Sequence, residues 1–155
     1  MIIREYVPAD CEFLARLFFE TIHSVNAADY SDEQLWAWAP GSRDLFTWHK
    51  SFMGHKTLVA VEDGAITGFG DIDSTGYLDR LFVRKDRQGL GIASALCSRL
   101  EEGFARVLTR SSITAKPFFL NRGYKVISEM QAVRSGISLT NFLMEKTTEH
   151  RQSDD

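Results

Sequence analysis

Cysteine, proline and runs of like charge are all scarce in this chain of 155 residues, which has only 2 Cys and 3 Pro. Two cysteines, Cys11 and Cys97, are too few for a disulfide scaffold, and neither has a second Cys or a His at metal-ligand spacing. We therefore expect two reduced core thiols, no metal site and a cytoplasmic location.

Basic surface and long apolar runs are scarce as well. The 18 Lys and Arg are outnumbered by 21 Asp and Glu, and no basic run occurs, which argues against a nucleic acid or an anionic membrane as partner. No apolar stretch approaches the roughly 18 residues that cross a bilayer, so we expect neither a membrane span nor an export signal. The chain has 44% hydrophobic and 25% charged residues. This composition, together with the chain length, is typical of a globular protein of one domain.

Hydrophobic periodicity predicts a mostly helical first third and a strand-rich remainder. Asp10 and the pattern Ser31-Asp32-Glu33-Gln34 are typical helix starts, and Asp63-Gly64 is a strong hairpin signal. We expect a folded domain over 1–146 and a polar, frayed tail over 147–155. The expected strands are 2–6, 56–62, 65–73, 77–83, 107–113, 124–133 and 138–145, and the expected helices lie within 11–25, 31–40, 43–53, 89–104 and 115–121.

A loop with two glycines, Gly89 and Gly91, leads from the strand over 77–83 into a helix. Glycine lets the backbone approach a ligand closely, and the free N–H groups of a helix start attract an anion such as a phosphate. A P-loop is excluded because Ile92-Ala93 stand where Lys and Ser or Thr are required. A dinucleotide-binding loop has weak support, since Thr109-Arg110 occupy the place of the expected acidic residue.

The segment Gln88-Gly89-Leu90-Gly91-Ile92-Ala93 resembles the Gln/Arg-x-x-Gly-x-Gly/Ala acetyl-CoA loop of the GNAT superfamily of N-acetyltransferases. Residues 115–124, AKPFFLNRGY, are similar to that family's Ala-x-x-Phe-Tyr-x-x-x-Gly-Phe segment. The resemblance extends over about residues 2–146. Within the superfamily, residues 112–119 and 30–38 resemble the YafP-like bacterial branch.

The resemblance implies an α/β (α+β) fold, in which one GNAT-like domain has a mixed, mostly antiparallel sheet of about seven strands with helices on both faces. It implies acetyl-CoA as co-substrate and no metal. Backbone groups of the strand would bind the pantetheine arm, and the loop would wrap the pyrophosphate. The implied cofactor-binding residues are Leu81, Phe82, Val83, Gln88, Gly89, Leu90, Gly91, Ile92, Ala93, Ser94 and Phe119.

Acetyl transfer requires a neutral amine. For an alkyl amine of pKa near 10.4, deprotonation at pH 7 costs about 4.6 kcal/mol of free energy. Asp79 is our candidate for the general base. Strand alternation places Tyr77, Asp79 and Leu81 on one face, opposite Arg80, so that Asp79 and Arg80 should not pair. If the turn over 74–76 has three residues, Asp71 lies across from Asp79 and raises its pKa. A structural ion pair of Asp79 is the alternative interpretation.

The acceptor site is less well defined by the sequence. Trp36 and Trp38 differ by about 200° around a helix, so one of them is available to line a pocket. Our candidate substrate residues are His23, Tyr30, Trp38 and Asp71. We assign no role to His49, His55 or His150.

One position departs from the family pattern. Many members carry a tyrosine that protonates the leaving thiolate where this chain has Phe119. A thiol of pKa about 8.5 makes the loss of that acid worth roughly 2 kcal/mol, which leaves transfer feasible. The expected activity is transfer of acetyl to an amine of a small molecule, peptide or protein, and the alternative is a non-catalytic acyl-CoA-binding module. The oligomeric state stays open, a homodimer included.

Overall fold

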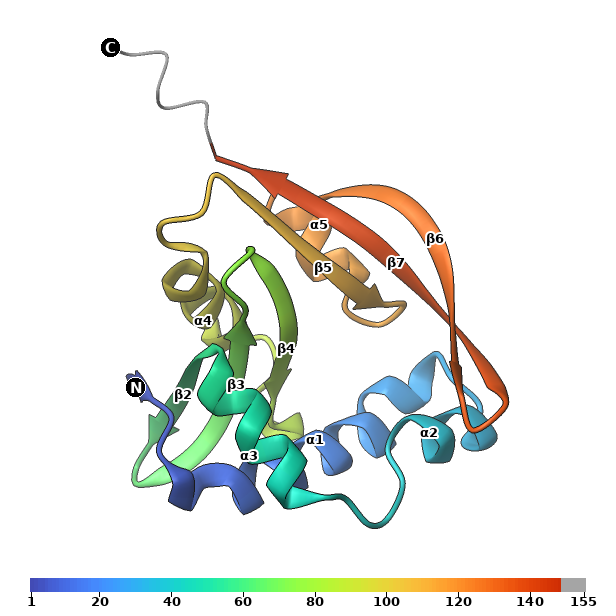
Figure 1. The fold of residues 1–155 in the computed structure, drawn as a ribbon, viewed down its shortest axis with the longest axis horizontal. Coiled ribbons are helices and arrows are strands. Elements are labelled where there is room, and N and C mark those ends of the chain that lie inside the picture. Colours follow the sequence, from blue (N-terminus) through green and yellow to red (C-terminus); the bar gives the residue numbers. More distant parts are fainter. Residues whose placement is uncertain (149–155) are drawn as a thin grey trace.

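The computed structural model describes residues 1–148 and contains one seven-stranded sheet in the order β1-β2-β3-β4-β5-β7-β6 (Figure 1). The strands are β1 (Ile2–Glu5), β2 (Lys56–Glu62), β3 (Ala65–Ile72), β4 (Tyr77–Val83), β5 (Arg106–Ser112), β6 (Lys125–Arg134) and β7 (Ile137–Thr147). The helices are α1 (Cys11–Ser24), α2 (Asp32–Trp38), α3 (Leu45–Gly54), α4 (Ile92–Glu101) and α5 (Lys116–Asn121), with 3-10 turns η1 (Pro8–Asp10), η2 (Asn26–Ala28) and η3 (Lys85–Arg87). The expected seven-stranded α/β fold is confirmed.

The expected tail begins within the last strand. Thr147 ends β7, and the N–H of Thr148 still bonds the carbonyl of Ala105 at 2.8 Å. Residues 149–155 of the expected tail, with His150 among them, lie outside the described residues.

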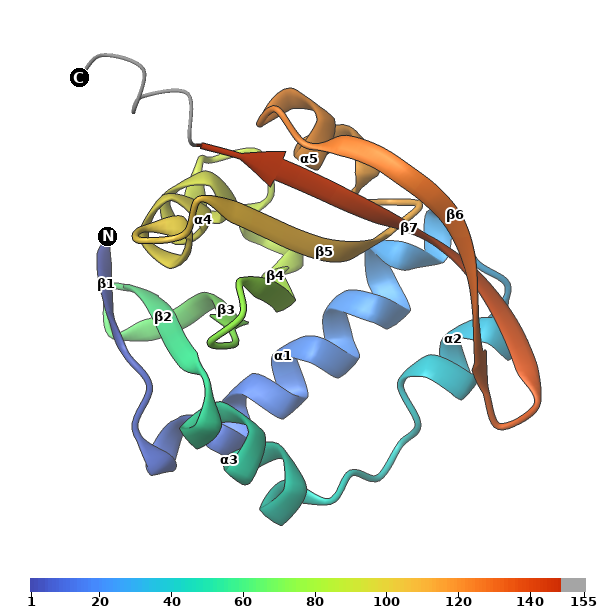
Figure 2. The same ribbon diagram turned by 45° about the horizontal axis from the view of Figure 1, so that its top comes forward.

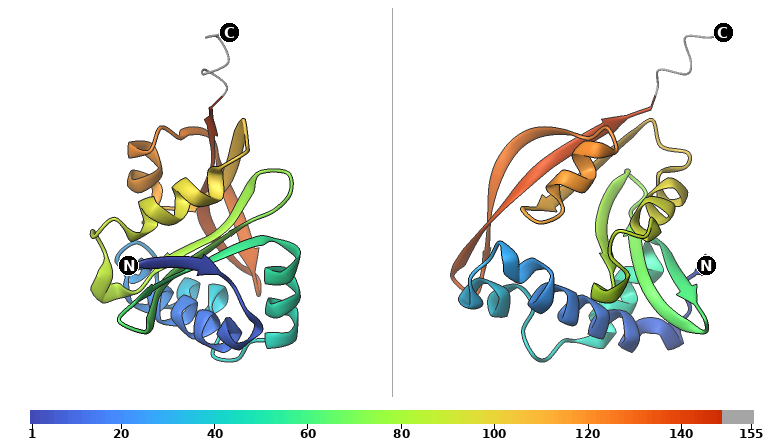
Figure 3. Two further views of the ribbon diagram at one scale, coloured as in Figure 1. Left: turned by 90° about the vertical axis from the view of Figure 1, so that its left-hand side faces the viewer. Right: turned by 180° about the vertical axis from the view of Figure 1, so that it is seen from behind.

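Helices cover both faces of the sheet (Figures 2 and 3). One hydrophobic cluster, called the α1-side cluster here, joins α1, α2 and α3 to the sheet through Phe18, Leu35, Phe52, Phe69 and Leu139, among others. The other, the α4-side cluster, joins α4 and α5 to the opposite face through Leu78, Leu96, Leu100, Phe119 and Met144, among others. Burial of these side chains on both faces supplies the main stabilisation of the fold.

The expected helix starts have local causes. Ser31 Oγ accepts from the N–H of Gln34 at 3.2 Å, and Gln34 Oε1 accepts from the N–H of Ser31 at 2.9 Å, which completes a capping box for α2. Asp10 accepts from the N–H of Val7 at 2.9 Å and pairs with Arg4 at 2.8 Å, so its carboxylate serves η1 rather than capping α1 itself.

The sheet separates between β4 and β5. These parallel neighbours are paired only at Tyr77 with Leu108 and at Leu78 with Thr109. Beyond that point the β1–β4 half and the β5–β7–β6 half diverge (Figure 2). Strand β4 therefore presents an edge unpaired with β5 from Asp79 onward.

A bulge interrupts β4 at Asp79. Asp73 N–H bonds Tyr77 O at 3.0 Å, so the turn has the expected three residues, and Ile72 pairs with Leu78. The next pair, however, is Asp71 with Arg80. The prediction that Asp71 lies directly across from Asp79 is therefore wrong, because the bulge leaves Asp79 without a partner.

The bulge also corrects the predicted faces. Leu81 and Val83 join Leu78 in the α4-side cluster, whereas Phe82 packs in the α1-side cluster. One extra residue in a strand exchanges the faces of all residues after it. Arg80 consequently lies on the α1 side, over the Phe52 ring at 4.4 Å.

Two expectations from composition can be compared with the described residues. Cys11 and Cys97 are both buried and free. Within residues 1–148, no helix combines the length and the apolar character that crossing a bilayer requires.

Close packing of α4 on the sheet leads to the first prediction. A Cβ at Gly70 would meet Leu100 Cδ1 at 2.9 Å and the Arg80 carbonyl oxygen at 3.0 Å. Gly70→Ala should therefore lower the free energy of unfolding by about 1–3 kcal/mol, measured by urea denaturation. Gly54→Ala is the control, because a Cβ there meets nothing within 4 Å. An unchanged midpoint for Gly70→Ala would contradict this packing of α4.

Candidate active site

A cavity of about 530 Å³ occupies the divergence of β4 and β5. Its wall combines β4, the loop before α4, the start of α4, β5, α5, α1 and the β6–β7 hairpin. Segments far apart in the chain therefore meet around one space. Among the residues lining it are Phe18, Asn26, Tyr30, Trp38, Tyr77, Asp79, Arg80, Leu81, Phe82, Val83, Gln88, Gly89, Gly91, Ile92, Ala93, Ser94, Arg110, Phe119, Arg134 and Asn141.

The loop before α4 is shaped to leave a helix N-terminus open. Gly91 precedes the helix with φ +87°, a left-handed conformation that favours glycine, and no side chain caps α4. Gln88 Nε2 donates to the carbonyl of Val83 at 2.6 Å and ties the loop to the end of β4. The first N–H groups of α4 can thus receive an anion at the positive end of the helix dipole.

Nearly all residues expected to bind cofactor line this cavity. The exception is Leu90, whose side chain is 64% exposed and absent from the lining. The loop presents Leu90 outward, so its predicted contribution is limited to its backbone.

Asp79 faces the cavity from the bulge. Its side chain remains 39% exposed. Burial and the negative charge of Asp71 raise the pKa of the Asp79 carboxyl, although Arg80 and His55 oppose the shift. Arg80 Nη2 lies 3.7 Å from Asp79 Oδ2, so the expectation that the two cannot pair is also wrong. A strand without a bulge would point them to opposite faces.

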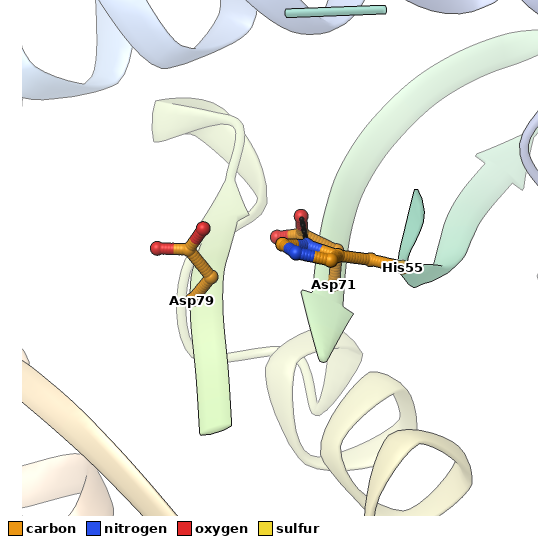
Figure 4. Close-up of side chains that lie close together, drawn as sticks. All are labelled: His55, Asp71 and Asp79. Carbon is orange, nitrogen blue, oxygen red and sulfur yellow. Dashed lines mark hydrogen bonds and ion pairs between the residues drawn. The ribbon is translucent and has the colours of Figure 1, made fainter. Parts of the chain in front are cut away.

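Asp71 lies behind this carboxylate and is fully buried. Arg80 donates to it twice, from Nε at 3.0 Å and from Nη2 at 2.6 Å, and the same Nη2 donates to Ser51 Oγ at 2.5 Å. His55 Nδ1 lies 2.8 Å from Asp71 Oδ2, the oxygen that also accepts from Arg80 Nη2. Figure 4 shows the His55 and Asp71 side chains together. Asp71, expected among the substrate residues, does not line the cavity, and its carboxylate is bound by Arg80 and His55 instead.

His55 is the functional candidate that sequence reasoning missed. It stands immediately before β2, 16 residues from Asp71, and the antiparallel pairing of β2 with β3 brings the two together. Its only signal in the sequence was its place at the start of a strand. The hydrogen bond to Asp71 raises the pKa of His55, against a smaller opposing effect of burial.

Ligand atoms of His55, Asp71 and Asp79 lie within 4.8 Å of one another. Figure 4 shows Asp79 standing apart on β4 while the other two side chains meet. Both carboxylate oxygens of Asp71 already accept from Arg80. A cation at this cluster would have to displace a guanidinium, so the arrangement is that of an ion-pair network.

The aromatic acceptor candidates divide into two groups. Tyr30 and Trp38 both line the cavity, with ring centroids 5.4 Å apart, and Tyr30 OH donates to Thr140 O at 2.7 Å. His23 does not line it: its ring stacks on Trp36 at 4.3 Å, and its Nε2 bonds Ala39 O at 2.8 Å. His23, expected at the acceptor site, is therefore covered by Trp36, which the short α2 helix turns onto α1.

Phe119 lines the cavity and is 4% exposed. Tyr124 packs against it at 5.0 Å between ring centroids. The Tyr124 hydroxyl, however, donates to Glu101 Oε2 at 2.6 Å in a buried site. Tyr124 is therefore not poised to replace the tyrosine that many family members have at the position of Phe119.

Comparison with known proteins agrees with this architecture. The family model described as "Acetyltransferase (GNAT) domain" matches residues 26–147. The uncharacterized N-acetyltransferase YafP of Escherichia coli K12 is 31% identical over 149 residues, which cover 96% of this chain and 97% of the relative.

Two solved structures show the same fold. A GCN5-related N-acetyltransferase from Rhodopseudomonas palustris has a TM-score of 0.91 and 30% identity and covers 95% of both chains. PaiA N-acetyltransferase from Thermoplasma acidophilum, solved with coenzyme A, has a TM-score of 0.77 at 20% identity, covering 95% of this chain and 98% of its own. The chain belongs to the GNAT acetyltransferase family.

The network behind Asp79 predicts how stability depends on pH. The folded-state pKa of His55 lies above its ordinary value of 6.5, so its protonation stabilises the fold fully below that value. This contribution is lost as the pH rises through the folded-state pKa. The unfolding free energy of wild type minus that of His55→Gln should therefore be larger at pH 5.5 than at pH 8.5, measured by urea denaturation.

His49→Gln is the matched control, because the His49 ring contacts the Tyr6 hydroxyl at 2.8 Å rather than a carboxylate. A wild-type minus His55→Gln difference that is equal at both pH values would contradict the hydrogen bond to Asp71.

Proposed function

We propose that this protein is an acetyl-CoA-dependent N-acetyltransferase that transfers acetyl directly to an amine of a small molecule, peptide or protein. One observation carries the proposal: a single cavity joins the uncapped N-terminus of α4 to the Asp79 carboxylate across the divergence of β4 and β5. Family membership supports the same conclusion.

The loop and the strand before it are suited to hold the co-substrate. The first N–H groups of α4 would receive the pyrophosphate, with Gln88 fixing the loop against β4. The β4 edge from Asp79 onward is unpaired with β5, so its backbone groups can bond an extended pantetheine arm as a neighbouring strand would. When bound, acetyl-CoA supplies the thioester acetyl group.

Asp79 is suited to remove a proton from the acceptor. A general base works best when its pKa lies near the working pH, and burial together with Asp71 moves the pKa of Asp79 in that direction. Asp71, which is held in place by Arg80 and His55, contributes to this rise after burial, the largest cause.

The leaving thiolate needs no side-chain acid at Phe119. A thiolate near the start of α4 would be stabilised by the positive end of the helix dipole, by about 0.3–1 kcal/mol at an exposed site. Solvent or the proton released by the amine can complete the reaction. The family tyrosine is thus dispensable here at an estimated cost of roughly 2 kcal/mol.

Binding is tested at Gly91. Acetyl-CoA at 100 times its Kd should add about 2.7 kcal/mol of stability and raise Tm. Gly91→Asp should abolish that rise, since it sets a negative charge against the phosphates. Gly103→Asp is the matched control, because Gly103 has nearly the same left-handed φ, +86°, and equally open surroundings. A full rise of Tm in Gly91→Asp would place the cofactor elsewhere.

Catalysis is tested at Asp79. Asp79→Asn should lower kcat by about 100-fold or more and remove the acidic limb of the pH–rate profile, with acetyl-CoA binding unchanged. Stability should hold, because a carboxyl with a raised pKa does not stabilise the fold at neutral pH. Asp63→Asn, in the exposed β2–β3 turn, is the control.

The two interpretations of Asp79 have different outcomes in this experiment. Wild-type rates together with lowered stability in Asp79→Asn would assign the residue to a structural ion pair. Saturable acetyl-CoA binding without transfer to any of a panel of amines would favour the non-catalytic acyl-CoA-binding module.

A further inference from the structure

Positive charge dominates the cavity wall. Within the described part of the chain, the lining includes one carboxylate, Asp79, and four guanidinium groups, those of Arg80, Arg87, Arg110 and Arg134. Two of these arginines are engaged: Arg80 pairs with Asp71 at 2.6 Å and Arg87 with Glu62 at 3.3 Å. Arg110 and Arg134 form no ion pair within residues 1–148.

Strand register places Arg110 on the same face of the sheet as Asp79. Val107 on β5 belongs to the α4-side cluster, so alternation turns Leu108 and Arg110 to the α1 side. Tyr77 pairs with Leu108, the first of the two pairs between β4 and β5. Asp79 and Arg110 each follow this pair by two residues, on opposite sides of the divergence. Both residues line the cavity, and the ion pairs found within residues 1–148 do not join them to each other.

Arg134 reaches the same face from the β6–β7 hairpin. Leu139 packs in the α1-side cluster and is paired with Ala132. Arg134 follows Ala132 by two residues and therefore shares its face. Arg110 on β5 and Arg134 at the end of β6 therefore line the same cavity from the same face of the sheet.

This division of charge selects among acceptors. A polyamine or a lysine-rich peptide would bring further positive charge to a wall that already holds two unpaired guanidinium groups. An amine that also carries a carboxylate would complement both charges of the wall: its amine would face Asp79, and its carboxylate would face the arginines. Guanidinium groups bind carboxylates through paired, charge-assisted hydrogen bonds. Trp38 and Tyr30 line the wall as well and would contact an apolar side chain.

We propose that the acceptor is an amino acid-like zwitterion, whose amine lies at Asp79 and whose carboxylate is bound by Arg110 and Arg134. The inference rests on the proposed acetyltransferase function and names its substrate class. Arg110 and Arg134 are then specificity-determining residues rather than groups that take part in the proton transfer.

Acetylation of matched pairs tests the proposal. The full-length protein is assayed with acetyl-CoA and free L-amino acids, aromatic ones included, each beside its own carboxamide, and with spermidine and a lysine peptide. We expect the best amino acid to exceed its carboxamide at least tenfold in kcat/KM. Arg110→Gln and Arg134→Gln should each lose about tenfold or more on the amino acid, mainly through KM, and stay within twofold on the carboxamide.

Arg106→Gln is the matched control, because Arg106 lies on the same strand but pairs with Glu145 and does not line the cavity. Equal rates for amino acids and carboxamides, a preference for spermidine or the lysine peptide, or unchanged kinetics in both arginine variants would overturn the proposal. So would an acetyl-CoA-dependent rise of Tm without turnover of any amino acid. Failure of the underlying acetyltransferase function is distinguishable, since none of the amines would then be acetylated, spermidine and the lysine peptide included, whether or not acetyl-CoA binds.

Discussion

The ion pair between Asp71 and Arg80 is the constraint on which the site depends. A fully buried carboxylate is tolerated only when a cation and hydrogen bonds compensate its lost hydration. Arg80 can supply both only if it, and not Asp79, stands opposite Asp71, and the bulge in β4 achieves this. The extra residue, Asp79, is thereby directed to the cavity, where burial and the nearby charge of Asp71 raise its pKa. One buried ion pair thus fixes both the register of β4 and the position of the Asp79 carboxylate.

Local patterns were sufficient for the elements but not for this register. The bounds of β2 and β4 and the capping box of α2 agree with the sequence prediction, because each follows from neighbouring residues. No local sequence pattern predicts the bulge at Asp79, because the alternation of side chains within one strand does not determine which residue of the neighbouring strand each of them pairs with. His55 was missed for the same reason, because only the pairing of β2 with β3 joins it to Asp71.

The two ends of the cavity differ in how far the sequence could define them. The end proposed to bind the cofactor is formed mainly by one continuous segment, in which glycines precede a helix start, and nearly all of its predicted residues line the cavity. The end proposed to bind the acceptor combines side chains from α2, β4, β5 and the β6–β7 hairpin. Trp38 lines the cavity, whereas His23 does not, because Trp36 covers it. Helical periodicity separates the faces of α1 but cannot say which neighbour each face meets.

The position of the chemistry is fixed by the sheet rather than by its loops. Thr109 Oγ1 donates to the carbonyl of Leu78 at 2.8 Å in a buried site, at the last paired position of β4 and β5. This bond fixes where the strands separate, and Asp79 is the next residue along β4. If β4 and β5 separated further along β4, the Asp79 backbone would be buried between the two strands. If they separated nearer the start of β4, the opening between them would move toward the turn over 74–76. Groups held on strands are positioned more exactly than groups on loops, which suits a reaction that brings an amine, a base and a thioester together within one narrow opening.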